Sequence, residues 1–474
     1  MAKTGMDRLK ELKPAIFRCI HCKACRFAYS GEPDRKGIGE FTGKQKTILY
    51  EGMVDACPAG IEYGWEAFWN AGKIWIARSI LTDDLKFSEQ VRDVIYPCIT
   101  CGLCSAQCEN KIPTVDVIEA LRAACVEAGV PLLDKHQLVK KLAEEKNNPY
   151  GGNPEDRMKW AKDAGLGKFI NNKSAKIGYF VGCTASYRQT EIAIATAKIL
   201  DKLGINFSLI DGEVCCGSPF FRVGAIPTAI KFVEKNMSLY KDFKFVIFSC
   251  AGCYRTFTVD YPKWLKEGKI PFKTKHAIEI ISDMVKEGKV KFKPKAELKG
   301  KKVTYHDPCH LGRHFGVEFE QELIKQSKNL MLDMRKLDKI LEDWFEKPRT
   351  ILKQLEKDVG IQFIEMYRVK MNSMCCGAGG GVRSGFADFS LHTASLRLDE
   401  ANAIGADIVT TECPFCFRNL TDANDLYKHG VKVYGLLEMI DKLDLLDVKE
   451  KPKEEDIINP KAPVKEEKRP ERKK

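Results

Sequence analysis

The cysteines are the residues of this 474-residue chain whose types and spacing could do chemistry, and ten of the nineteen fall into two copies of one pattern. Each copy has a single cysteine, a Cys-Cys-Gly doublet and a Cys-x-x-Cys pair. The first copy consists of Cys183, Cys215, Cys216, Cys250 and Cys253, and the second of Cys309, Cys375, Cys376, Cys413 and Cys416. Five thiols in each copy is one more than a single zinc or cubane site uses. The pattern therefore predicts a metal centre in each half.

Eight further cysteines near the start of the chain predict two cubane clusters. Three cysteines at two-residue gaps can wrap a loop around three corners of one cluster, which leaves the fourth corner for a distant cysteine. In two-cluster ferredoxins that fourth ligand comes from the other run. The predicted sets are Cys19, Cys22, Cys25 and Cys108 for cluster one, and Cys98, Cys101, Cys104 and Cys57 for cluster two.

Zinc is the alternative metal for these eight thiols. Zinc knuckles usually show two separated Cys-x-x-Cys pairs, whereas a triple run occurring twice favours iron and sulfur. The chain departs from the ferredoxin pattern because 31 residues separate Cys25 from Cys57 and because Glu109, not proline, follows Cys108. Cys125 lies on the apolar stripe of a predicted helix and is expected to be a buried core thiol.

Composition limits the other classes of function. The length predicts two to four domains, and 44% hydrophobic residues suffice for buried cores. The net charge of +12 comes from intermixed basic and acidic residues, which argues against nucleic acid as a partner. The polar start of the chain and its many cysteines predict a reducing, cytoplasmic location. No apolar run approaches the roughly 18 residues of a membrane span, so membrane association is expected only through a partner subunit.

Changes in hydrophobic period along the chain predict the elements that position the cysteines. Residues 1–130 form the two-cluster domain, and 131–175, rich in charge and turn formers, form a linker. In the first repeat, residues 176–295, predicted strands alternate with helices and each leads into a cysteine group; these strands are 177–181, 205–210 and 243–248. Parallel strands place such ends on one edge of a sheet, where open α/β folds form their sites. The five thiols are therefore expected to converge.

The second repeat, residues 296–447, follows the same plan. Its predicted strands are 303–305, 352–355 together with 360–363, and 408–410, and a helical insertion at 318–347 explains its greater length. Residues 448–474 lack apolar periodicity and are expected to be a disordered charged tail. The predicted fold class is α+β overall, with an α-helical ferredoxin-like domain followed by two α/β repeats that have short parallel sheets.

The doublets in Val214-Cys-Cys-Gly-Ser-Pro and Met374-Cys-Cys-Gly-Ala-Gly-Gly-Gly resemble the cysteine-rich CCG repeats of the heterodisulfide reductase family. From about residue 15 to 440 the chain is similar to the D-type subunit, which looks like a two-cubane subunit fused to two such repeats. The resemblance implies a non-cubane four-iron cluster in one or both five-cysteine sets, so all ten repeat cysteines become candidate catalytic residues. It also implies that the disulfide between coenzyme M and coenzyme B, or an analogous disulfide, is cleaved between the clusters.

Two functions stay open on the sequence alone. Complete ligand sets favour an enzyme like heterodisulfide reductase, which needs a small-molecule or protein disulfide as substrate. The alternative is an electron-transfer subunit that links a flavoprotein dehydrogenase for lactate, glycolate or an acyl-CoA to a membrane cytochrome or quinone pool. The insertion after Cys25 is consistent with a docking surface for such partners. Either function requires redox partner subunits, a membrane b-type cytochrome or a flavoprotein.

Several residues beside the cysteines are further candidates. Four of them are His306, His310, His314 and Arg383. Each could donate a proton, bind an anionic group of the substrate, or make a structural hydrogen bond. Close approach of the backbone to a cluster or substrate, or a tight turn, would explain Gly377, Gly379, Gly380 and Gly381.

Overall fold

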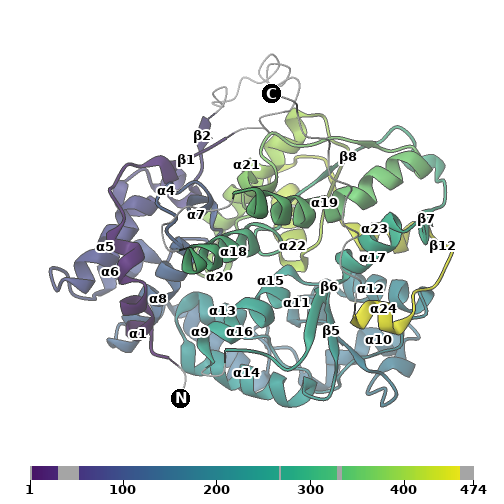
Figure 1. Ribbon diagram of the computed structural model, residues 1–474, viewed down its shortest axis with the longest axis horizontal. Coiled ribbons are helices and arrows are strands. Elements are labelled where there is room, and N and C mark those ends of the chain that lie inside the picture. Colours follow the sequence, from purple (N-terminus) through teal and green to yellow (C-terminus); the bar gives the residue numbers. More distant parts are fainter. Residues whose placement is uncertain (1–2, 30–52, 266–267, 328–333, 460–474) are drawn as a thin grey trace.

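The computed structural model describes residues 3–29, 53–265, 268–327 and 334–459 (Figure 1). It confirms the mixed fold class, with a mainly helical N-terminal domain followed by two α/β repeats with parallel sheets. In Figure 1 the N-terminal domain, in purple and blue, lies at one side and contacts both the first repeat, in teal, and the second, in green and yellow. Among the described residues no helix is both long enough and apolar enough to span a membrane.

The N-terminal domain is built around α8 (Thr114–Glu127), against which α1, α5, α6 and α7 pack. The apolar stripe of α8 is fully buried, and Cys125 on it is 1% exposed, which confirms its place in the core. The other elements are α1 (Gly5–Glu11), α2 (Lys13–Phe17), α4 (Pro58–Tyr63), α5 (Asn70–Leu81), α6 (Glu89–Ile95), α7 (Leu103–Ala106), and the antiparallel pair β1 (Phe27–Tyr29) and β2 (Met53–Asp55). Most of the insertion between Cys25 and Cys57 lies outside the described residues.

The first repeat contains a parallel sheet in the order β4-β3-β5-β6. Its strands are β3 (Ile177–Phe180), β4 (Phe207–Ser208), β5 (Phe245–Phe248) and β6 (Lys273–His276). The first three match the predicted strands, whereas β6, Lys-Thr-Lys-His, has no apolar run by which it could be predicted. The helices are α11 (Cys183–Tyr187), α12 (Thr190–Lys202), α13 (Ser218–Val223), α14 (Ile226–Tyr240), α15 (Ala251–Arg255), α16 (Tyr261–Trp264) and α17 (Ala277–Lys286), followed by β7 (Val290–Phe292).

The second repeat has the same topology, with the sheet order β9-β8-β10-β11. Its strands are β8 (Lys302–Tyr305), β9 (Gln362–Phe363), β10 (Ile408–Thr411) and β11 (Lys432–Gly435). Its helices are α18 (Arg313–Gln326), α19 (Met334–Val359), α20 (Val382–Gly385), α21 (Ala387–Ala403), α22 (Pro414–Tyr427) and α23 (Leu436–Lys442). The order of strands and helices therefore recurs in the two halves, as the cysteine pattern does.

One predicted strand of the second repeat is wrong. Residues 352–355 belong to α19, and only 362–363 form the strand β9. Ile351, Leu352 and Leu355 are fully buried at a spacing that places them on one helix face. A short apolar run fits either element, and here the helical segment that precedes it continues through it. The predicted insertion 318–347 falls within α18 and α19, apart from residues outside the described part.

The two repeats meet through equivalent elements. The strand β7 of the first repeat pairs antiparallel with β12 (Leu446–Val448), which follows the second repeat's last helix as β7 follows the first's. Likewise α12 packs against α23, and α17 packs against α19, so a long helix of each repeat contacts the last helix of the other. Such reciprocal pairing is the signature of a two-fold relation between the repeats.

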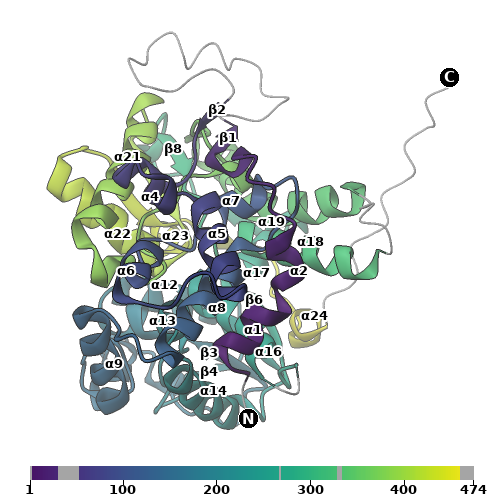
Figure 2. The same ribbon diagram turned by 90° about the vertical axis from the view of Figure 1, so that its left-hand side faces the viewer.

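Two segments that were predicted to lie outside the domains, a linker and a disordered tail, take part in the fold. The segment 131–175 contains α9 (Asp134–Lys146) and α10 (Lys159–Asp163), and α9 packs against α20 of the second repeat. The predicted disorder is wrong for residues 448–459, where β12 ends and α24 (Glu454–Ile458) buries two isoleucines that are too few to give a period. Residues 460–474 lie outside the described residues. Figure 2 shows α24 beside the first repeat, where Lys273 of β6 donates to the carbonyl oxygen of Ile458 at 3.1 Å.

Candidate metal centres

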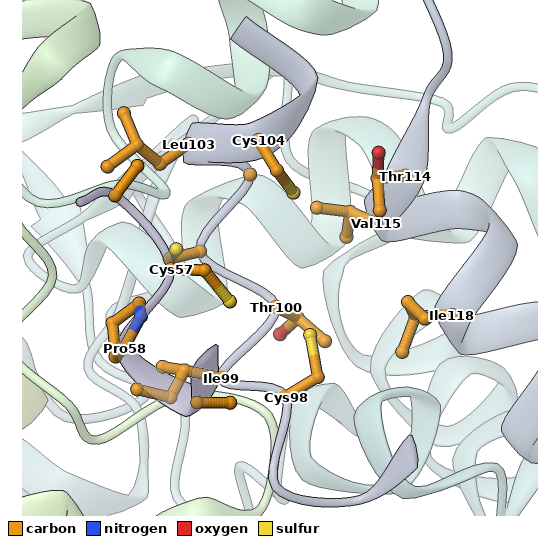
Figure 3. Close-up of a pocket in the computed structure, with 14 residues that line it drawn as sticks. Cys57, Pro58, Cys98, Ile99, Thr100, Leu103, Cys104, Thr114, Val115 and Ile118 are labelled. Atoms are coloured by element: carbon orange, nitrogen blue, oxygen red, sulfur yellow. The ribbon is translucent and has the colours of Figure 1, made fainter. Parts of the chain in front are cut away.

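The four cysteines predicted for cluster two line one cavity, where α4 and α7 begin (Figure 3). Figure 3 shows Cys57, Cys98 and Cys104 pointing into the same space, with Val115 and Ile118 of α8 on its wall. Burial raises the pKa of Cys57 to about 11. Burial likewise raises the pKa of Cys104, and the neighbouring thiolates raise it further. Converging thiols in an apolar pocket fit a cationic iron–sulfur core, which would offset their mutual repulsion.

The cysteines predicted for cluster one also come together. Burial raises the pKa of Cys108, and the nearby thiolates of Cys19 and Cys22 raise it further. The pKa of Cys25 is raised to about 11 by burial and by Cys108, Cys19 and Cys57. Because Cys57 is predicted for cluster two and lies near Cys25, the two predicted N-terminal sites are direct neighbours. Among all nineteen cysteines only Cys22 is exposed, so this is the site nearest the surface.

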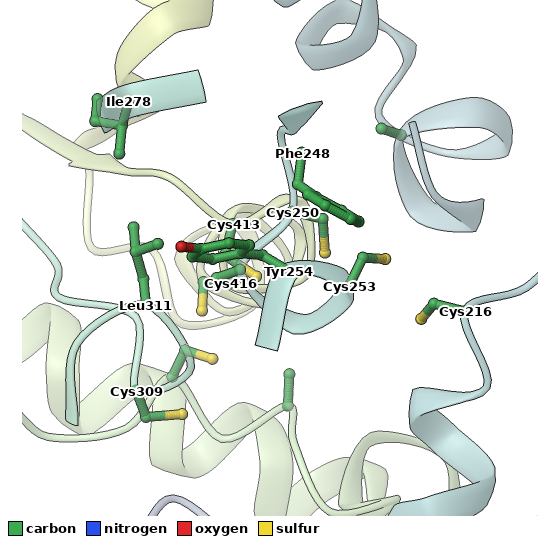
Figure 4. Packing of buried hydrophobic residues seen from close by; sticks show 14 of the residues in the cluster. Cys216, Phe248, Cys250, Cys253, Tyr254, Ile278, Cys309, Leu311, Cys413 and Cys416 are labelled. Atoms are coloured by element: carbon green, nitrogen blue, oxygen red, sulfur yellow. The ribbon is translucent and has the colours of Figure 1, made fainter. Parts of the chain in front are cut away.

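All ten repeat cysteines line a single cavity of about 130 Å³ between the two sheets' cysteine-bearing edges. Figure 4 labels six of them, with Cys309 and Cys216 toward opposite sides and the two Cys-x-x-Cys pairs between. Hydrogen bonds between thiols connect them in the order Cys183, Cys215, Cys216, Cys253, Cys250, Cys413, Cys416, Cys376, Cys375, Cys309. This order is palindromic about the pair Cys250 and Cys413. The two-fold relation between the repeats therefore passes through the site itself.

The doublets have the same local structure in both repeats. Gly217 and Gly377 adopt φ values of 83° and 85°, and each donates its amide to the sulfur two residues earlier at 3.4 Å. A side chain at Gly377 would also lie 2.3 Å from the carbonyl oxygen of Ser390. Glycine is therefore required there by backbone conformation and by space, which confirms the tight turn as one role of this glycine.

The site of the first repeat is bordered by a buried arginine. Both terminal nitrogens of Arg157 lie 3.7 Å from the sulfur of Cys183, and Nη2 donates to Glu213 at 2.6 Å. The carboxylate of Glu213 also accepts from the amides of Val181 and Gly182 at the end of β3. A fixed positive charge therefore faces this sulfur, and one carboxylate ties the strand end to the doublet. Arg157 lies in the predicted linker, where no sequence signal marked it.

Histidines border the second site instead. His310 Nδ1 lies 3.2 Å from the sulfur of Cys309, and His314 stacks on His310 with ring centroids 4.2 Å apart. His306 lies within metal-ligand range of Cys376 and Cys416. All three predicted histidines therefore reach the site, whereas Arg383 pairs with Asp422 at 2.5 Å and does not line the cavity. The two sites differ in the charge that surrounds equivalent sulfurs.

The N-terminal domain touches the second site directly. The thiol of Cys375 hydrogen-bonds to Cys101 of cluster two, which lowers the pKa of Cys101 to about 7. A side chain at Gly379 or Gly380 would lie within 2.7 Å of the carbonyl oxygen of Ile99 or Cys98. These two glycines thus permit the loop of cluster two to approach the doublet. The contacts join the cysteines predicted for cluster one, those predicted for cluster two, and those of the second and first repeats into one path of neighbouring thiols.

Two buried arginines hold this junction in place. Arg122 of α8 donates to the carbonyl oxygens of Cys98, Gly380 and Arg222, one in each of the three domains. Arg313 donates to the carbonyl oxygens of Cys101 and Ser373. The sequence did not predict either role, because an arginine that binds only backbone carbonyls needs no acidic partner whose position in the sequence could indicate the contact.

The lining of the cavity includes the half-buried side chains of Tyr150 and Phe415. The Tyr150 hydroxyl hydrogen-bonds to Thr184 at 2.9 Å. The guanidinium groups of Arg188 and Arg418 lie 5.3 Å and 5.6 Å from the centre of the Tyr150 ring. Two cations therefore lie beside the Tyr150 ring, although neither lines the cavity.

Comparison with family models agrees with this organisation. A 4Fe-4S dicluster domain matches residues 15–112, and a cysteine-rich domain matches residues 177–258 and again 339–421. Cys309 lies outside the second match, although the structure places it beside Cys375.

Known proteins similar to this chain are redox subunits and oxidoreductases. The D-type component of the dihydromethanophenazine:CoB–CoM heterodisulfide reductase from Methanosarcina mazei is 37% identical, over 74% of this chain and 78% of that protein. The B-type component of the CoM/CoB fumarate reductase from Methanothermobacter marburgensis is 31% identical, over 74% of this chain and 62% of that protein. The EtfAB:quinone oxidoreductase of Syntrophomonas wolfei is 26% identical, over 75% and 46%. The chain therefore belongs to the family of D-type heterodisulfide reductase subunits, iron–sulfur oxidoreductases that join a dicluster domain to two cysteine-rich domains.

Proposed function

We propose that the chain reduces a disulfide held between its two repeats, with electrons supplied through the N-terminal domain. The observation that carries the proposal is the single cavity lined by two complete five-cysteine sets. In this proposal each repeat set holds one four-iron centre, and the eight N-terminal cysteines hold two cubanes. The substrate is the disulfide of coenzymes M and B, as named for the relatives, or an analogous anionic disulfide. The two cations beside Tyr150, Arg188 and Arg418, support an anionic substrate.

Reduction of a disulfide consumes two electrons and two protons and releases two thiols. Iron–sulfur centres supply electrons one at a time. Two sites related by a two-fold axis can each face one sulfur of a disulfide that lies across the axis at Cys250 and Cys413. The cysteines of both repeats would surround this bond, and Arg188 and Arg418 beside Tyr150 would attract the charged ends of the substrate. His310 lies at the second site, within reach of a thiolate product that needs a proton.

Electron transfer without substrate chemistry is the second candidate. The observation that favours it is the similarity to the EtfAB:quinone oxidoreductase, whose name joins a flavoprotein to quinone. In that case the thiol path would serve only as a conduit from a flavoprotein to a membrane acceptor.

Titration of the anaerobic, oxidised protein with candidate thiols distinguishes the two functions. If a disulfide is reduced here, a product thiol should perturb the electron paramagnetic resonance signal of a repeat centre and leave the cubane signals unchanged. Cys125→Ser is the matched control, because this buried thiol lies in α8 outside the predicted ligand sets, and it should respond as the wild type does. No thiol-dependent signal with any anionic thiol would favour the conduit.

A further inference from the structure

The surface around cluster one carries an unusual concentration of exposed apolar side chains. Of the six large apolar residues exposed in the described chain, Ile20, Trp65 and Trp75 lie here, with exposed fractions of 72%, 75% and 41%. Ile20 directly precedes His21 and Cys22, the exposed cysteine of the predicted cluster. Large apolar side chains that gather at one place on a surface usually mark an interaction site.

Contacts of His21 show that these residues form one patch. The His21 ring lies 5.2 Å from the Trp75 ring, and its Nε2 lies 3.0 Å from the carboxylate of Glu66, the neighbour of Trp65. Lys23 reaches the same carboxylate at 3.4 Å. The Arg78 guanidinium lies 5.1 Å from the Trp75 ring. We name this patch the docking face: Ile20, Cys22, Lys23, Trp65, Trp75 and Arg78.

The docking face lies away from the substrate cavity. Figure 2 shows α2 and α5, which flank it, on the side of the N-terminal domain that faces the viewer, with the repeats behind. The cavity is lined by residues of the repeats and of the segment that leads into them, and by none of the docking face. Cluster one is also the farthest from the repeats along the path of neighbouring thiols. An electron donor that docked here would meet the outer end of that path.

We propose that the docking face binds an acidic electron-carrier protein that holds a one-electron cofactor near its surface. Tryptophan and arginine are the residues that most often dominate binding at protein interfaces. The described part of the patch is mainly basic: it contains Lys23 and Arg78, and Lys13 lies over the same Phe17 ring as Arg78, while Glu66 is the carboxylate that Lys23 contacts. Opposite charge on the partner would steer its approach and set its orientation. This proposal rests on the proposed electron path and not on the identity of the disulfide.

A membrane surface is the competing occupant, since tryptophan with basic residues also suits lipid headgroups. An interfacial helix would present one wide apolar stripe. Here the exposed side chains come from two loops and one turn of α5, gathered around a predicted cluster ligand. A partner bound to this arrangement lies close to the predicted cluster, and electron transfer requires a short distance. Binding to a lipid surface does not depend on that distance.

The test is stopped-flow reduction of the anaerobic, cluster-loaded protein by reduced plant-type [2Fe–2S] ferredoxin, an acidic one-electron protein. Trp65→Ala and Arg78→Glu should each lower the second-order rate constant by about tenfold. Leu426→Ala and Lys241→Glu are the matched controls, because both side chains are exposed on other faces, and they should keep the wild-type rate. Raising the salt concentration should slow the wild type more than Arg78→Glu.

Reduction by methyl viologen, a small dye that needs no docking, separates failure of this proposal from failure of the electron path. If the docking face is right, all variants should accept electrons from the dye at the wild-type rate. Normal dye and ferredoxin rates in both docking-face variants would overturn the docking face alone. A wild type that neither donor can reduce would instead contradict the electron path. The docking face would also be overturned if Trp65→Ala lost binding to phosphatidylglycerol vesicles while its ferredoxin rate stayed normal.

Discussion

At the scale of single residues, buried polar side chains that bind backbone carbonyls connect the three domains. Arg122 binds carbonyl oxygens of all three domains through its positively charged guanidinium group. Burial of this charge lowers the pKa of Arg122. His136 makes such a contact as a neutral ring, which lies 2.8 Å from the carbonyl oxygen of Gly381 and stacks on Tyr96. Such groups are costly to bury and more costly to leave unpaired. They therefore fix the relative positions of the loops that carry the cysteines.

His136 gives a prediction for pH dependence. Burial lowers the pKa of His136 to about 4, so between pH 6.5 and 4 the unfolded chain binds a proton that the folded chain does not. Stability from this residue is present above pH 6.5 and is lost as the pH falls toward 4. In His136→Gln the amide can still donate to Gly381 but does not titrate. We expect its melting temperature, measured by anaerobic scanning fluorimetry, to fall less between pH 7 and pH 5 than that of the wild type. An equal fall would contradict the assignment.

At the scale of elements, the strands that carry cysteines were predictable, and the edges of the sheets were not. The strands β3, β5, β8 and β10 are rich in apolar and β-branched residues, and a cysteine follows the end of each within four residues, so the sequence indicates both their position and their role. The edge strands β6 and β11 contain lysines and alternate weakly, because one side of each has no neighbouring strand to bury it. The helix α19 was predicted wrongly for a different reason: its buried face continues beyond the predicted insertion.

The glycine loop after the second doublet packs against the loop that carries the cysteines predicted for cluster two. Gly380 has φ of 65°, and a side chain there would lie 2.4 Å from the carbonyl oxygen of Cys98. We expect Gly380→Ala to separate the two loops and to slow reduction of the repeat centres by about tenfold or more, with the cubanes reduced at the normal rate. Gly430→Ala is the control, because Gly430 has φ of 77° but no atom lies within 4 Å of the place that a β-carbon would take there. Equal rates for both variants, followed by stopped-flow absorbance, would show that the approach does not matter.

At the scale of the whole molecule, repetition in the sequence becomes a two-fold relation between the repeats. The cysteine pattern predicted two similar halves, and parallel strands predicted that each set would converge. The facing of the two sets could not be predicted, because it depends on β7 pairing with β12 and on the reciprocal packing of four helices. Nor did the sequence indicate that Cys101 would meet Cys375, a contact between residues far apart in the chain.

The number of irons follows from the whole assembly. Two cubanes and two four-iron repeat centres predict about sixteen irons and sixteen acid-labile sulfides in each chain. Metal and sulfide analysis of anaerobically purified protein checks this number. Recovery of about eight irons would contradict the prediction that the repeats hold clusters. Recovery of stoichiometric zinc would contradict the cubane assignment.

The central claim is that both repeats act together on a disulfide, and disulfide-dependent oxidation of reduced viologen dye tests it most directly. Cys216→Ser and Cys376→Ser change equivalent positions of the two sets, whereas Cys125→Ser changes a thiol outside them. We predict that each of the first two variants loses about a hundredfold or more in disulfide turnover, a barrier increase of about 2.7 kcal/mol, while the third keeps wild-type turnover. Retention of wild-type turnover by either Cys216→Ser or Cys376→Ser, with its cubanes intact, would contradict the claim.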